Sequence, residues 1–202
     1  MQTRPSPNLL AGVCVLALCG LTLTQTACAP ARPAFADITP ASTAMSAPTQ
    51  YVDVGGDRIG YRSFGQGDPI VFITRMRGTM DTWDPLFLDG VGRAHRVILV
   101  DYPGVGYSSG TLPQTIASAA DLVAAFATAI NLSRFTVAGW SWGGAVAQTV
   151  MLEHPDRISH AIIMGANPPG ELVRPIQQAF LDRAFKPVND LADEEVPFFS
   201  QP

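Results

Sequence analysis

From residue 51 onward the chain alternates between short apolar runs and segments with helical spacing. Four runs are continuously apolar, as expected of strands buried on both faces of a parallel sheet: 69–73, 96–100, 135–138 and 161–164. Ahead of them, residues 51–54 and 58–62 alternate in polarity around Gly55-Gly56, which predicts a hairpin. The pattern predicts an α/β fold with a mostly parallel sheet and an antiparallel N-terminal hairpin.

Three segments have the spacing of amphipathic helices. Residues 115–130 are alanine-rich with an apolar face, and residues 144–153 form a second helical segment between two strands. The third, 171–185, follows the break at Pro168-Pro169-Gly170 and lies outside the strand–helix alternation. We therefore expect a core domain over 51–170 and the start of a helical lid over 171–202.

The N-terminus has the pattern of an export leader. Arg4 supplies a positive charge, and the uncharged apolar stretch 9–23 follows it. This stretch is shorter than the roughly 20 residues that span a bilayer and has the size of a signal-peptide apolar region. Residues 1–36 are predicted to be a signal peptide or lipoprotein leader, and a retained membrane anchor is the alternative.

Two processing sites compete in this leader, near positions 28 and 36. Ala34-Phe35-Ala36 has the A-x-A form of a cleavage site, but it lies far beyond the apolar run. Cys28 resembles the lipid-modified cysteine of a bacterial lipoprotein, although Gln25 stands where such signals carry leucine. Lipid modification at Cys28 is the slightly favoured interpretation. The protein is thus expected to be exported: periplasmic, secreted or membrane-anchored through lipid on Cys28.

Cysteine placement fits an oxidising compartment. All three cysteines lie in or beside the leader: Cys14, Cys19 and Cys28. The folded domain therefore has neither a disulfide framework nor a cysteine metal site. Residues 37–50, rich in Ala, Ser, Thr and Pro, are interpreted as a flexible linker.

Composition changes the picture little. With 47% hydrophobic and 15% charged residues, the chain can bury a core. The net charge of −4, without a basic stripe, argues against nucleic-acid binding. No metal or organic cofactor is predicted, and membrane contact is expected only through the leader.

The candidate chemistry lies in Gly139-Trp140-Ser141-Trp142-Gly143, a G-x-S-x-G pentapeptide. An apolar run precedes it and a small-residue helical segment follows, which is the strand–turn–helix setting of a nucleophile elbow. The flanking glycines leave room for a strained serine backbone. Ser141 is therefore the predicted nucleophile, and a glycine-rich turn without chemistry is the alternative.

Together with two further motifs, this pentapeptide resembles the α/β-hydrolase family over residues 51–166. The segment DYPGVGYS at 101–108 looks like the family's D-x-x-G-x-G-x-S, and EHPDRI at 153–158 looks like its H-P-x-x-V turn. Trp83 sits where relatives often carry tryptophan. The resemblance implies a serine hydrolase that cleaves a small-molecule ester or amide through an acyl-enzyme.

The resemblance also implies an oxyanion hole made by two backbone N–H groups. One belongs to Trp142, which follows the nucleophile, and the other to Met76, in the loop after the strand 69–73. Arg75 and Arg77 depart from the small or apolar residues usual in this loop. They orient either an anionic substrate group or another part of the loop, or they form a solvated surface pair, and the solvated pair is the favoured interpretation.

The acid and the histidine of a triad are not found. In the family they follow the serine, acid before histidine. The chain's histidines, His95, His154 and His160, are expected at the end of the sheet opposite Ser141. The acidic residues after Ser141 fall in the lid segment: Asp182, Asp190, Asp193, Glu194 and Glu195. We therefore expect a truncated chain that lacks the C-terminal strands and is inactive. The alternative function is a non-catalytic ligand-binding or interaction protein on the same scaffold.

Overall fold

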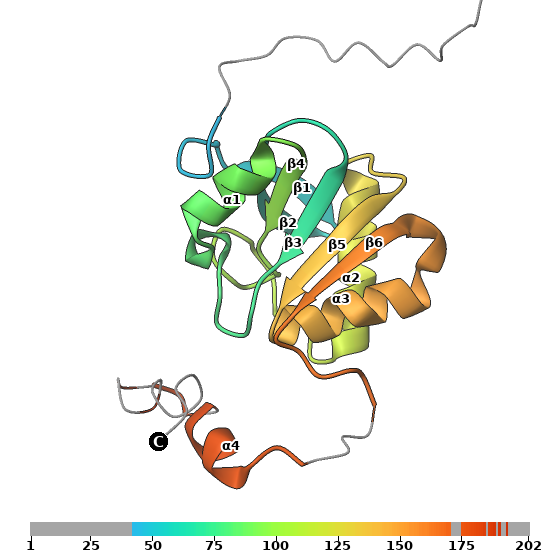
Figure 1. Ribbon diagram of the computed structural model, residues 1–202. Helices are drawn as coiled ribbons and strands as arrows, with labels where there is room; N and C mark the ends of the chain where they lie inside the picture. The colour runs from blue at the N-terminus through green and yellow to red at the C-terminus, as the bar shows by residue number, and fades with distance from the viewer. Residues whose placement is uncertain (1–41, 171–174, 185, 189, 191–192, 194–202) are drawn as a thin grey trace, which may run out of the picture. The chain divides into compact units, whose positions relative to one another are not determined.

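A computed structural model describes residues 42–170, 175–184, 186–188, 190 and 193 of the chain. In this part, one six-stranded sheet has the order β1-β2-β4-β3-β5-β6 (Figure 1). The strands are β1 (Gln50–Val54), β2 (Asp57–Phe64), β3 (Pro69–Ile73), β4 (Arg96–Val100), β5 (Phe135–Trp140) and β6 (Ile158–Met164). The helices are α1 (Pro85–Gly92), α2 (Ile116–Ala129), α3 (Trp142–Glu153) and α4 (Gln178–Ala184), with short 3-10 turns at Met80–Thr82 and Pro155–Arg157.

Strand pairing confirms the predicted fold class. β1 and β2 form an antiparallel hairpin, and its turn is made by Gly55 and Gly56 at φ 61° and 94°, where glycine carries no steric cost. β2 is also antiparallel to β4, whereas β4, β3, β5 and β6 are mutually parallel. The sheet is therefore mostly parallel with an antiparallel N-terminal hairpin.

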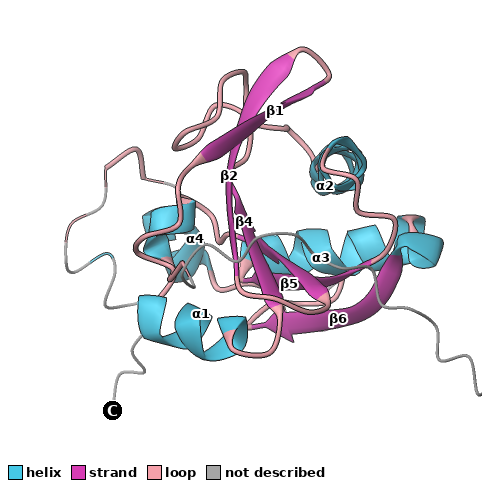
Figure 2. Ribbon diagram, turned by 90° about the horizontal axis from the view of Figure 1, so that it is seen from above, coloured by secondary structure: helices cyan, strands magenta, loops and turns pink. Residues whose placement is uncertain are grey.

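The sheet lies between two helical layers (Figure 2). Helix α1 covers one face, and α2 and α3 cover the other. Because side chains alternate along a strand, Val71 and Ile73 of β3 join the core beneath α2 and α3, while Ile70 and Phe72 join the core beneath α1. All four side chains are at most 4% exposed, so β3 is buried on both faces as its apolar run predicts.

The helices begin where local capping dictates. In α2 the Thr115 hydroxyl accepts from the backbone N–H of Ser118, and the Ser118 hydroxyl accepts in return from the backbone N–H of Thr115. Helix α1, which the pattern analysis missed, begins with Asp84 as its N-cap and Pro85 at its first position. The Asp84 carboxylate accepts from the backbone N–H of Phe87 at 3.0 Å.

Several boundaries differ from those predicted. Strand β6 begins at Ile158 and not at 161, and helix α3 begins at Trp142 and not at 144. Of the lid helix predicted over 171–185, residues 178–184 form α4 and 175–177 are not helical, whereas 171–174 and 185 lie outside the described residues.

The leader predicted over 1–36 lies wholly outside the described residues. Of the predicted linker, residues 42–50 are described, and in them Ala44 and Ala47 are buried against the core beneath α1. The backbone N–H of Ala44 donates to the Asp89 carboxylate at 2.7 Å. Within the described part of the chain, no helix is long and apolar enough to cross a membrane.

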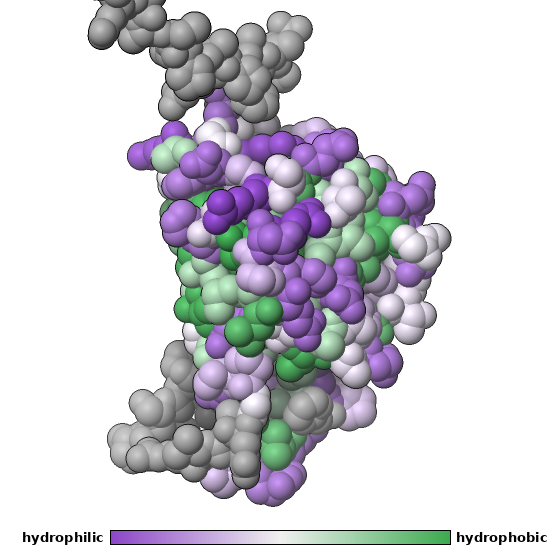
Figure 3. Space-filling model, turned by 90° about the vertical axis from the view of Figure 1, so that its right-hand side faces the viewer, coloured by the Kyte–Doolittle hydropathy of each residue, from purple (hydrophilic) through white to green (hydrophobic). Residues whose placement is uncertain are grey.

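Strand β6 is the last strand of the described sheet and contributes to a partly apolar surface. Viewed from the side on which β6 lies, apolar side chains are interspersed with polar ones (Figure 3). The exposed apolar residues on β6 and the end of α3 are Met151, Leu152, Ile162 and Ile163.

Candidate functional site

The candidate site is built around Ser141, where β5 passes into α3. Ser141 has φ 56° and ψ −119°, a conformation that non-glycine residues rarely adopt. A Cβ on Gly139 would lie 2.1 Å from the carbonyl oxygen of Gly143, so only glycine permits this tight turn. The backbone N–H of Ser141 donates to the Met164 carbonyl at 2.8 Å, while its side chain makes no capping bond to α3. The backbone of Ser141 is thus fixed by hydrogen bonding, while its hydroxyl does not cap helix α3.

The topology brings a second loop to the same place. The chain leaves β3 for β4 on one side and later enters β5 on the other, so β3 lies at the point where strand order reverses. Ligands in parallel α/β sheets bind at such a point, beyond the carboxyl ends of the strands. Here the first turn of α3 touches the end of β3: a Cβ on Gly143 would lie 2.4 Å from the Ile73 carbonyl oxygen and 2.5 Å from that of Thr74.

The loop after β3 carries Met76 and the two arginines. Its turn is closed by the Gly78 N–H, which donates to the Arg75 carbonyl at 3.0 Å. Arg77 has φ 59°, a left-handed conformation usually taken by glycine. Arg75 donates from Nη1 to the Met76 carbonyl at 3.1 Å, and its guanidinium carbon lies 5.5 Å from the ring centroid of Trp140. Two strained backbone positions, Arg77 and Ser141, therefore flank the candidate site.

Asp101 ties this loop to the loop after β4. Its carboxylate is fully buried and accepts from the Met80 N–H at 2.7 Å and from the Tyr107 N–H at 2.9 Å. A Cβ on Gly106 would lie 2.2 Å from this carboxylate, so the glycine of the 101–108 motif makes room for it. Burial raises the pKa of Asp101, although the two N–H donors partly oppose the rise. The motif therefore serves to fix the relative position of two loops.

A pocket of about 300 Å³ lies beside these loops. It is lined by residues 75–78 after β3, Tyr102 and Val105 after β4, 112–116 at the start of α2, and Trp142 after the serine. Met76 and Trp142, the two predicted oxyanion donors, therefore line one pocket, and Ser141 is the residue next to Trp142. The ring of Tyr102 packs edge-on against Trp142 at 4.9 Å between centroids.

Three buried polar atoms around this region have no hydrogen-bond partner among the described residues: Thr74 Oγ1, Trp83 Nε1 and the Tyr102 hydroxyl. Burial raises the pKa of Tyr102 well above its usual value, so this hydroxyl stays protonated. Unsatisfied buried polar groups are uncommon and cost stability, and a catalytic role is one recognised reason for retaining them. Sequence reasoning did not identify Tyr102 or Asp101 as individual site residues, although both lie in the motif it quoted.

The histidines lie where the topology predicts, away from Ser141. His95 directly precedes β4, and His160 pairs with Thr136 near the start of β5, whereas Ser141 follows its end. His154 ends α3, a 12-residue helix that begins directly after Ser141 and is roughly 18 Å long.

The acidic residues of the predicted lid have local partners. The Asp182 carboxylate accepts from Gln178 at 2.6 Å, and that of Asp193 pairs with Lys186 at 2.6 Å. The carboxylate of Asp190 accepts a hydrogen bond from the backbone N–H of Asp193 at 2.9 Å. Glu194 and Glu195 lie outside the described residues.

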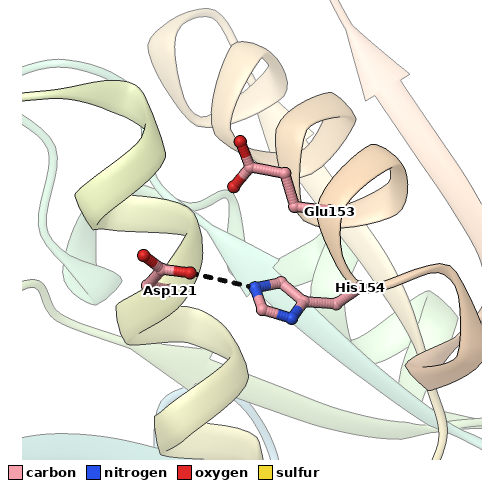
Figure 4. Close-up of side chains that lie close together, drawn as sticks. All are labelled: Asp121, Glu153 and His154. Atoms are coloured by element: carbon pink, nitrogen blue, oxygen red, sulfur yellow. Dashed lines mark hydrogen bonds and ion pairs between the residues drawn. The ribbon is translucent and has the colours of Figure 1, made fainter.

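A group of possible metal ligands lies at the far end of α3 (Figure 4). One donor atom from each of Asp121, Glu153 and His154 lies within 4.8 Å of the others. His154 Nε2 is 3.1 Å from the carboxylate of Asp121, which joins α3 to α2. Because Asp121 and Glu153 are exposed, we interpret the pair between His154 and Asp121 as a surface contact between α3 and α2.

Comparison with known proteins agrees with this architecture. The family model for the alpha/beta hydrolase fold matches residues 68–194. An alpha/beta hydrolase fold protein from Chitinophaga pinensis superposes with a TM-score of 0.70 at 33% identity, over 80% of this chain and 59% of that one.

Two curated relatives are similar in sequence. The pimeloyl-[acyl-carrier protein] methyl ester esterase of Vibrio campbellii is 31% identical over 115 residues, which is 57% of this chain and 43% of the esterase. The dihydrolipoyllysine-residue acetyltransferase component of the acetoin cleaving system of Cupriavidus necator is 37% identical over 112 residues, or 54% of this chain and 29% of that protein. The matched segments thus span less than half the length of these relatives.

Proposed function

The chain belongs to the α/β-hydrolase fold family, and from this premise we propose that it is an ester or amide hydrolase that acts through Ser141. The observation that carries the proposal is the backbone of Ser141, held at φ 56° between β5 and α3. Such strain persists only where the surrounding structure imposes it, and it is typical of catalytic positions. Similarity to an esterase of Vibrio campbellii supports the same reaction class.

The proposed reaction is acyl transfer. Ser141 Oγ attacks the carbonyl carbon, its proton passes to a general base, and a tetrahedral oxyanion forms. The N–H groups of Met76 and Trp142 are the proposed donors to that oxyanion, and the N-terminus of α3 adds partial positive charge. Collapse expels the alcohol or amine with a proton and leaves an ester on Oγ, which water then cleaves.

No histidine of the chain is placed to act as the general base for Ser141. The chain's three histidines are His95, His154 and His160, and each lies toward the end of the sheet away from Ser141. Without a base at the serine, ester turnover by these 202 residues is expected to be negligible. A p-nitrophenyl ester assay in which turnover disappears in Ser141→Ala would contradict this expectation.

A fluorophosphonate probe tests the nucleophile directly. Oγ displaces fluoride and forms a phosphonate ester, which intact-mass spectrometry and peptide mapping locate. We expect only slow labelling at Ser141, since the proposed oxyanion donors act there without a general base; the label should be lost in Ser141→Ala and kept in Ser133→Ala, the control. No labelling of the wild type even after prolonged exposure, or labelling unchanged in Ser141→Ala, would favour a non-catalytic ligand-binding protein on the same scaffold.

We also propose export through residues 1–36, with lipid on Cys28. The apolar stretch 9–23 and the position of Cys28 behind it support this assignment. In a bacterial host, Cys28→Ser should move the protein from the membrane fraction to a soluble one, while Cys19→Ser should not. Membrane association retained in Cys28→Ser would contradict lipidation.

A further inference from the structure

The side chain of Arg75 is held in place beside the pocket. It is half-buried, its guanidinium lies over Trp140 at 5.5 Å, and it donates to the Met76 carbonyl at 3.1 Å. A guanidinium has five N–H donors in a planar fork, so this bond leaves most of them available. The charge is therefore fixed next to the loop that carries the proposed oxyanion donor. A freely solvated surface arginine would not be held in this way.

Nothing acidic compensates this charge within the described residues. No carboxylate there forms an ion pair with Arg75, and none of the residues that line the pocket is acidic. Arg77 also lines the pocket, but its Nη2 donates to the backbone carbonyl of Lys186. The other walls of the pocket include the apolar side chains of Val105, Leu112 and Ile116.

We propose that Arg75 binds a carboxylate of the substrate, so that the pocket beside Ser141 takes short half-esters or half-amides of dicarboxylic acids. The inference rests on the proposed function of Ser141. A single planar fork matches the two oxygens of a carboxylate, and apolar walls suit the methylene chain between the two ends.

The chain between the two functional groups must be short. Arg75 is the immediate neighbour of Met76, the proposed oxyanion donor, and its guanidinium folds back onto the Met76 carbonyl. A ligand whose carboxylate binds Arg75 and whose ester carbonyl binds the Met76 N–H therefore contacts two adjacent residues of one loop. A pocket of about 300 Å³ is also at the lower end of the range for small-molecule sites.

The competing role is purely structural. Arg75 bridges Met76 and Trp140, so it would also hold the loop after β3 against the turn at Ser141. If Arg75 were purely structural, its replacement would lower the affinity for neutral and anionic ligands equally. A carboxylate-binding arginine affects only the anionic one, which makes the difference between matched ligands the decisive readout.

The test is calorimetric titration with monomethyl glutarate, which carries one carboxylate, and with dimethyl glutarate, its neutral match. At neutral pH we expect the wild-type chain to bind the half-ester about 10- to 100-fold more tightly, as a charge-assisted hydrogen bond allows. Arg75→Gln should reduce this preference to within about 2-fold. The matched control is Arg58→Gln, since Arg58 also lies over an aromatic ring, Tyr51 at 4.3 Å, but on the hairpin. It should keep the full preference.

Circular dichroism establishes that each variant is folded. Equal affinity for the two ligands, no binding of the half-ester, or a preference that survives Arg75→Gln would overturn the proposal. An equal loss for both ligands in Arg75→Gln would assign Arg75 the structural role. In Ser141→Ala the preference should persist, because carboxylate binding does not need the hydroxyl. Failure of phosphonate labelling with the preference intact would therefore reject the proposed nucleophile alone.

Discussion

Gly143 lies at the closest approach between the turn at Ser141 and the loop after β3, and its replacement by alanine is the sharpest test of this packing. The added Cβ would lie 2.4 Å and 2.5 Å from the carbonyl oxygens of Ile73 and Thr74. Ordinary contacts at a Cβ begin at 3.4 Å, so the backbones must separate by about 1 Å. Both oxygens belong to backbone, and neither can rotate away as a side chain could.

Two effects of opposite sign determine how much Gly143→Ala changes the free energy of unfolding. Overpacking in a rigid environment costs about 1–3 kcal/mol, and more when backbone must move. Alanine in place of a helical glycine returns about 0.5–1 kcal/mol. We therefore expect Gly143→Ala to lower the free energy of unfolding by about 2 kcal/mol. Fluorophosphonate labelling of Ser141 should slow in parallel, because the loop with Met76 shifts.

Equilibrium urea denaturation followed by circular dichroism measures the stability change. The matched control is Gly90→Ala in α1, where an added Cβ would meet nothing within 4 Å. This control should gain about 0.5–1 kcal/mol, because only the helix-propensity term remains. Gly143→Ala as stable as the wild type, or stabilised like Gly90→Ala, would refute the close approach of the two backbones.

Two further substitutions address the strained serine and the buried carboxylate. Ser141→Gly should raise the free energy of unfolding by about 1 kcal/mol through release of backbone strain, whereas Ser141→Ala should leave it nearly unchanged; equal effects in urea titrations would contradict the strain. Asp101→Asn should cost about 1–3 kcal/mol, because the N–H groups of Met80 and Tyr107 bond different carboxylate oxygens and an amide replaces one of these oxygens with an NH2 donor. Burial raises the Asp101 pKa in the folded state, so the unfolded chain loses its proton first as the pH rises. The stability advantage of wild type over Asp101→Asn should thus shrink from the ordinary aspartate pKa up through the raised one, and a constant difference across that window would contradict the shift.

The sheet was predictable because burial on two faces leaves an unambiguous pattern. Runs such as Pro69–Ile73 place consecutive apolar residues on opposite faces, and the structure buries both. Helix α1 was missed because its apolar residues do not form one stripe: Leu86 is 82% exposed while Leu88 is 1% exposed. Its capping pair, Asp84-Pro85, was the available signal. In the predicted lid segment the apolar spacing was regular, yet residues 175–177 are not helical, so periodicity alone did not locate the start of α4.

The candidate site likewise has features that the sequence predicts and features that depend on the folded structure. Ser141, Met76 and Trp142 were assigned from a local motif and a family resemblance, and those roles stay predictions. The buried carboxylate of Asp101 and the pocket wall at 112–116 could not be assigned from sequence, since they depend on loops that meet only in the folded sheet. The reading of Arg75 as a solvated residue rested on the usual exposure of arginines. Its contact with Trp140, 65 positions away in the sequence, carries no local signal.

The position of Arg75 follows from the strand order. The loop that leaves β3 begins beside the end of β5, because these two strands are parallel neighbours and Ile73 pairs with Gly139. The residue at the start of that loop is therefore placed against Trp140, the last residue of β5, whatever its side chain. The arginine lies over the ring of Trp140 and adds a cation to the lining of the pocket, which a small residue would not do. If Arg75 binds a carboxylate as proposed, its substitution should change the ligand preference of the pocket while the backbone bond from Ser141 to the Met164 carbonyl is kept.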